Sequence, residues 1–155
     1  MRLYLVQHGD AVDKQVDPDR PLSEAGVRSV ELVGAFISKA GVRVDEVCHS
    51  GKTRARQTAE RLAKHVAAPG SVEERRGLGP KDPIGSLRKV VSACTEDLMV
   101  VGHLPHLSKV ASSLLVHDEE AEVIAFEKGC VVCLERVDDE WSVRWMVTPA
   151  IVLGR

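Results

Sequence analysis

The chain has 155 residues, of which 44% are hydrophobic and only 3% aromatic, and its formal net charge is -2. With few aromatic rings and no basic excess, the chain has neither the stacking platform nor the Lys/Arg-rich surface of a nucleic-acid-binding protein, so we expect no nucleic-acid partner. No stretch reaches the roughly 18 apolar residues of a membrane-spanning helix, and the apolar start is too short for a signal peptide. We therefore predict a cytoplasmic protein, without a membrane partner, in which residues 1–155 form one domain.

The first half of the chain alternates strand and helix patterns. A buried strand is expected over residues 2–6, followed by a long polar loop over residues 9–21. Ser23 is placed to cap a helix whose apolar positions continue with helical spacing as far as Gly41. A second strand is expected over residues 44–49, and Ser50 is then placed to cap a helix over about residues 52–66.

The second half continues this alternation and then changes to strands. Val72 fits a short edge strand, and a helix near residues 84–95 precedes a continuous apolar strand at 98–101; Pro105 then suits the first turn of a helix that runs to about Val116. The last predicted strands cover residues 123–126, 130–137 and 141–147, with a hairpin turn at 138–140. The order predicts an α/β sandwich with an antiparallel edge.

The cysteines show no disulfide framework. Cys130 and Cys133 match the C-x-x-C pattern, but they lie in a predicted strand, where side chains three positions apart point to opposite faces. We therefore expect buried thiols and no metal site at this pair.

Polar residues follow three of the predicted parallel strands. His8 follows the first strand, His49 and Ser50 end the second and lead into Arg54, and His103 follows the central strand. In open α/β sheets, ligands bind outside the carboxyl ends of the strands, so these residues are expected to meet at one crevice. Two histidines and an arginine beside helix N-termini favour an anion site. Two imidazoles would also suit a metal ion, but no H-x-x-x-H or nearby carboxylate–histidine spacing accompanies them.

Four segments, in chain order, resemble the motifs of the histidine phosphatase superfamily, and in particular of its short SixA-type phosphohistidine phosphatase branch. They are LVQHGDA at residues 5–11, RPLSEAG at 20–26, SGKTRARQTAE at 50–60 and VGHLP at 101–105. Each segment is short, but four in register are specific together. The resemblance implies a phosphoglycerate mutase-like fold, which is a three-layer α/β/α sandwich with a mostly parallel central sheet and an antiparallel C-terminal hairpin.

The resemblance also implies a mechanism that these residue types support. His8 would attack phosphorus as the neutral imidazole and become phosphorylated, and water would then hydrolyse the phosphohistidine. Arg54 would bind the equatorial phosphoryl oxygens, and His103 would donate to another oxygen, most usefully as the imidazolium. No metal and no cofactor is expected. The further phosphate-binding positions implied are Gln7, Gly9, Arg20 and Leu104.

The chain departs from the family pattern at Gln7, where the family has an arginine directly before the nucleophile. Glutamine donates hydrogen bonds but carries no charge. Losing one charge-assisted contact costs roughly 2–4 kcal/mol of transition-state stabilisation, or about 30- to 1000-fold in rate. Two functions therefore stay open at this stage: an active phosphatase, and a weakened or inactive relative that binds phosphorylated protein without turnover.

No carboxylic acid is singled out by spacing to protonate a leaving group. The loop positions that offer one are Asp10, Asp17, Glu73, Glu74 and Asp82. A phosphohistidine substrate relaxes this need, since imidazole leaves more readily than an alkoxide. We therefore expect a phosphorylated protein carrying phosphohistidine, or else a small phosphorylated substrate. A phosphoglycerate mutase ranks lower, because the chain lacks an insertion that would cap the substrate.

Other features are assigned no catalytic role. Gly51-Lys52-Thr53 invites a nucleotide-binding interpretation, but a phosphate-binding loop needs a glycine where this chain has Glu46, so we reject it. The histidines expected to be non-catalytic are His49, His65, His106 and His117.

Overall fold

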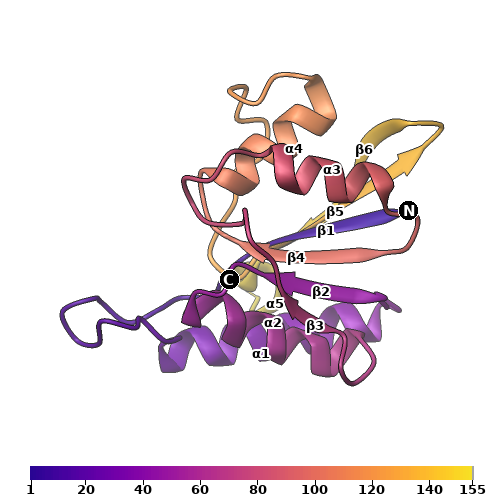
Figure 1. The fold of residues 1–155 in the computed structure, drawn as a ribbon. Helices are drawn as coiled ribbons and strands as arrows, with labels where there is room; N and C mark the ends of the chain where they lie inside the picture. The colour runs from indigo at the N-terminus through magenta and orange to yellow at the C-terminus, as the bar shows by residue number, and fades with distance from the viewer. Residues whose placement is uncertain (155) are drawn as a thin grey trace.

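The computed structural model describes residues 1–154, which form a six-stranded sheet with helices on both faces (Figure 1). The strand order is β3-β2-β4-β1-β5-β6. Strands β1 to β4 run parallel, whereas β5 pairs antiparallel with β1, and β6 pairs antiparallel with β5. The strands are β1 (Arg2–Gln7), β2 (Glu46–His49), β3 (Val72–Glu74), β4 (Leu98–Gly102), β5 (Val131–Val137) and β6 (Glu140–Val147).

The helices form the two outer layers. Figure 1 shows α1 and α2 on one face of the sheet and α3 and α4 on the other. The helices are α1 (Glu24–Lys39), α2 (Thr53–Val66), α3 (Gly85–Ala93), α4 (His106–Val116) and the short α5 (Pro149–Val152). The fold is therefore the predicted α/β/α sandwich of the phosphoglycerate mutase type, with the antiparallel hairpin at its C-terminal edge.

Alternation along the strands divides the core into two hydrophobic clusters. On β1, Tyr4 and Val6 pack with the apolar sides of α1 and α2, whereas Leu3 and Leu5 pack with those of α3 and α4. This is the period-two geometry of a strand that is buried on both faces. No helix within residues 1–154 is long and apolar enough to cross a membrane.

The paired cysteines follow the same alternation. Cys130 belongs to the cluster under α3 and α4, and Cys133 to the cluster under α1 and α2. Both are buried free thiols, as predicted from their strand spacing. Within residues 1–154, no group of three or more histidine, cysteine or acidic side chains is arranged to hold a metal ion.

Three sequence predictions of local structure differ from the structure. Residues 123–126 form no strand; Ile124 and Phe126 instead pack partly buried against the core beside α4, so their apolar character reflects packing rather than sheet pairing. Ser50 does not cap α2, because it lies two residues before the N-cap, Lys52; its hydroxyl instead accepts from the Lys52 N–H at 3.3 Å and bonds to a histidine ring in the site described below. The short α5 was not predicted, although Thr148 caps it and Pro149 begins it.

Candidate active site

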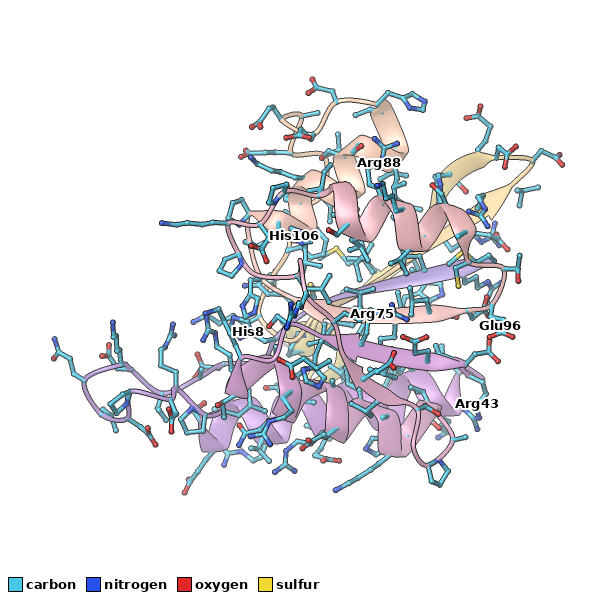
Figure 2. All side chains as sticks on the ribbon, in the orientation of Figure 1. His8, Arg43, Arg75, Arg88, Glu96 and His106 are labelled. Atoms are coloured by element: carbon cyan, nitrogen blue, oxygen red, sulfur yellow. The ribbon has the colours of Figure 1, made fainter. Side chains whose placement is uncertain are left out.

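His8, Arg54 and His103 lie together at the carboxyl ends of the parallel strands. His8 follows β1, His103 follows the neighbouring β4, and Arg54 lies on the first turn of α2, which follows β2. The His8 and His103 ring centroids are 5.1 Å apart, and Arg54 Nε donates to His8 Nε2 at 3.3 Å. Figure 2 labels His8 at this end of the sheet. The strand ends thus bring Arg54 and His103 next to His8, as the strand order predicts.

Two hydrogen bonds fix the ring of His8. Its Nδ1 lies 2.7 Å from the carbonyl oxygen of Gly9. Because a carbonyl only accepts, Nδ1 carries the ring proton, and Nε2 keeps its lone pair and accepts from Arg54. Burial, and then the positive charges of Arg54, Arg20 and Lys128, lower the pKa of His8 to about 4. At neutral pH the ring is therefore neutral, with its free lone pair directed at a cation.

His103 is also neutral in this structure. Its Nε2 lies 2.7 Å from the Ser50 hydroxyl, and its Nδ1 is buried without a hydrogen-bond partner. Burial, followed by the proximity of His8 and Arg54, lowers the pKa of His103 to about 3. The imidazolium expected from the sequence is thus disfavoured before an anion binds, although a neutral imidazole still donates one hydrogen bond.

Thr58, which sequence reasoning missed, joins the His8 segment to the Arg54 helix. Its hydroxyl is fully buried, accepts from Gly9 N–H at 3.0 Å and donates to the Arg54 carbonyl at 2.8 Å. The neighbouring Gln57 accepts from the backbone N–H of Leu22 at 2.7 Å. These contacts give a structural reason for the Gln-Thr pair that follows Arg54 in its motif.

Gly26 allows α1 to approach the His8 loop closely. A Cβ atom at this position would overlap the backbone of Asp10, so a larger residue would force the helix away from the loop. The Asp10 side chain accepts from the hydroxyl of Ser23, the N-cap of α1, at 2.6 Å. The start of α1 therefore supports the segment that follows His8.

The four further residues predicted from the sequence border the site in different ways. Gln7 is buried on β1, and its Oε1 has no hydrogen-bond partner. Gly9 already uses its N–H for Thr58 and its carbonyl for His8. Arg20 donates from Nε to the Val12 carbonyl at 3.2 Å, and its charge acts on both His8 and Arg54. Leu104 is 38% exposed in the turn between β4 and α4.

The candidate acids have different surroundings. The Ser23 hydroxyl and Lys128 lower the pKa of Asp10, which keeps it ionised near neutral pH. Glu74 ends β3 at the same edge of the sheet as His8, and its carboxylate fills the space beside Gly51. The other acids lie in local contacts: Asp17 with the Asp19 N–H, Asp82 with the Gly79 N–H, and Glu73 with Arg75.

The remaining histidines differ in their surroundings. His49 accepts from the Gly51 N–H, His65 pairs with Glu31, and His117 ends α4 in a left-handed conformation. His106, labelled in Figure 2, lies 1% exposed at the start of α4. Neither of its ring nitrogens has a hydrogen-bond partner.

Comparison with known proteins finds matches in sequence and in fold. Residues 3–78 match the family model of the histidine phosphatase superfamily (branch 1). An uncharacterised protein from Picosynechococcus sp. is 28% identical over 165 residues, which cover 95% of this chain and 99% of that protein. The segment that matches the family model, residues 3–78, contains His8 and Arg54.

Two solved structures share the fold over nearly the whole chain. The protein histidine phosphatase SixA, complexed with tungstate, has a TM-score of 0.87 at 23% identity and covers 98% of this chain and 99% of its own. The alpha-ribazole phosphatase from Shigella flexneri has a TM-score of 0.75 at 15% identity, covering 96% and 97%. Residues 3–78 match the histidine phosphatase superfamily, and nearly the whole chain has the fold of the short SixA-type structures.

Proposed function

We propose that the protein is a phosphohydrolase that uses His8 as its nucleophile. The observation that carries this proposal is the state of His8 Nε2, which is unprotonated and lies 3.3 Å from Arg54 Nε. A lone pair held against a cation is suited to attack an anionic phosphoryl group that the same cation binds. The contact with Arg54 is long for a hydrogen bond, so an arriving phosphoryl oxygen can replace it at low cost.

The reaction takes two displacements. The lone pair of His8 Nε2 attacks phosphorus, a P–Nε2 bond forms, and the bond to the leaving group breaks with its electron pair going to that group. Arg54 and His103 hold the phosphoryl oxygens as charge redistributes. Water then attacks the phosphorus, the P–Nε2 bond breaks, its electron pair returns to His8, and both protons of the water leave with inorganic phosphate as dihydrogen phosphate. The Nδ1–H···O contact with Gly9 supports the positive ring during the intermediate.

We propose phosphohistidine in a protein as the substrate, with a small phosphorylated compound as the alternative. Asp10, which lies nearest to His8 in sequence among the candidate acids, is kept ionised, so it is poorly suited to protonate an alkoxide. An imidazole leaving group takes its proton from solvent and needs no such acid. Fold similarity to SixA, described as a protein histidine phosphatase, supports the same choice. A cytoplasmic location and the absence of a cofactor stay predictions from the sequence.

Turnover of a phosphohistidine-containing peptide tests this function. We expect the wild-type protein to release phosphate and His8→Asn to lose activity by at least about 1000-fold, since the nucleophile is gone. His117→Asn is the matched control, because asparagine tolerates the left-handed backbone of His117 and the site is untouched. Equal turnover by wild type and His8→Asn would overturn the role of His8.

The second candidate function is phosphoprotein binding without turnover. The observation that favours it is Gln7, a neutral side chain buried at the strand end that carries the nucleophile. Tungstate or phosphate binding measured by calorimetry, together with no phosphate release from any phosphorylated substrate tried, would support binding alone over catalysis.

A further inference from the structure

The charge around His8 is unevenly distributed. Arg54 approaches the ring from α2, and Arg20 lies on the loop before α1. The strand that carries the nucleophile contributes only the neutral Gln7. A transferring phosphoryl group spreads negative charge over its oxygens, so a cation on the β1 side would complete the charge stabilisation.

The segment before β5 lies against the backbone of the nucleophile. The N–H of Gly129 donates to the carbonyl oxygens of both Gln7, at 2.9 Å, and His8, at 3.1 Å. Gly129 has a positive φ of 78°, a backbone conformation that glycine adopts without strain. Its neighbour Lys128 is therefore held beside the end of β1, although 120 positions separate it from His8 in the sequence.

The side chain of Lys128 forms an ion pair with an acid of the loop that follows His8. Its Nζ lies 3.3 Å from Oδ1 of Asp10, which comes two residues after His8. The Asp10 carboxylate is itself oriented by a hydrogen bond from the Ser23 hydroxyl at 2.6 Å. This orientation sets where the Lys128 ammonium lies when it pairs with Asp10. The Lys128 charge reaches His8, whose pKa it helps to lower.

The ion pair with Asp10 is weak enough to be exchanged. The Lys128 and Asp10 side chains are 52% and 49% exposed, and exposed pairs contribute only about 0–1 kcal/mol. An ammonium on a flexible stem has three donors, so it can bind a dianionic phosphoryl oxygen without fully leaving a monoanionic carboxylate. The ion pair thus keeps the Lys128 ammonium close to the His8 loop, where it is available when a substrate binds.

We propose that Lys128 is a phosphoryl-binding residue that supplies the positive charge at the His8 strand end, where β1 itself provides only Gln7. This inference rests on the proposed function and adds a residue to its site. It also explains how a site with a neutral residue before the nucleophile retains enough positive charge to bind a phosphoryl group.

Four variants test the inference: Lys128→Met, Gln7→Arg, their combination, and Lys89→Met. The last is the matched control, since it removes the same charge from an exposed position on α3. We expect Lys128→Met to weaken binding of inorganic phosphate and to lower kcat/KM, each by about 10- to 100-fold, as for loss of one charged hydrogen bond. Gln7→Arg should recover most of this loss in the combined variant, because it restores a cation at the same strand end.

Nuclear magnetic resonance titration of His8 gives an independent readout. Removing the Lys128 ammonium should raise the pKa of His8, whereas Lys89→Met should leave it unchanged. Phosphate affinity, kcat/KM and a His8 pKa in Lys128→Met that all match those of Lys89→Met would overturn the inference while leaving the proposed function intact. A wild-type protein that neither binds phosphate nor turns over substrate would overturn both.

Discussion

Burial sets the protonation of the two histidines at the centre of the site. His8 and His103 are 7% and 2% exposed, and their rings lie within the field of Arg54. Desolvation and a nearby cation both disfavour the imidazolium, so both act in the same direction. For His8 this produces a nucleophile that stays deprotonated at Nε2 throughout the neutral range. For His103 it means that a bound phosphoryl dianion must supply the opposite charge if the ring is to become protonated.

The pKa of His8 is therefore a residue-scale prediction. We expect its ring to titrate near pH 4 in the free protein, and Arg54→Gln to raise this pKa toward the ordinary value because one lowering charge is removed. Since protonation blocks Nε2, the nucleophile is lost as the pH falls through about 4 and is retained above it. Titration of the His8 ring resonances in wild type and Arg54→Gln checks this. A wild-type His8 pKa of 6.5 or above would contradict it.

At the scale of elements, the site is formed by residues at the ends of two strands and at the start of one helix. β1 and β4 place His8 and His103 side by side, and the first turns of α2 bring Arg54 to the same edge. Thr58, one turn further along α2, then ties this helix to Gly9. We therefore expect the position of Arg54 to depend on this fully buried hydroxyl.

Removing that hydroxyl tests the link between α2 and the His8 loop. Thr58→Val keeps the shape but leaves the Gly9 N–H without its acceptor, which we expect to cost about 1–3 kcal/mol of stability and to lower kcat. Thr58→Ser should recover kcat because it keeps the hydroxyl. Kinetics and thermal unfolding should be compared with Val91→Ala, a cavity-forming variant in the core under α3. If Thr58→Val loses no more activity than Val91→Ala at equal stability, the positioning role is wrong.

For the whole molecule, the sequence predicted the architecture because strand and helix patterns alternate along the chain and polar residues lie at or just after the ends of β1, β2 and β4. That pattern also predicted which residues meet, since the carboxyl ends of parallel strands share one edge. Residues 123–126 were mistaken for a strand because an apolar run does not say whether it pairs or packs. Lys128 lies two residues after that segment, and its proximity to His8 depends on β5 lying beside β1. A local sequence pattern cannot predict a contact between residues this far apart in the chain.

The protonation of His103 was likewise beyond the sequence. Residue type predicts an imidazole that can become charged, but the pKa depends on burial and on the distances to His8, Arg54 and Lys52. The role of Thr58 depends in the same way on the approach of two separate segments. Tertiary structure therefore supplies the electrostatics of this site, whereas sequence supplies its principal side chains.

Direct detection of the covalent intermediate is the measurement that tests the central claim most directly. The protein is mixed with a phosphohistidine peptide, quenched within milliseconds in alkaline denaturant, and analysed by mass spectrometry of its own peptides. We predict a phosphoryl group on His8 that is stable in alkali, lost in acid and absent from His8→Asn. Phosphate release by the wild-type protein with no phosphoryl group on His8 at any time point would contradict the account.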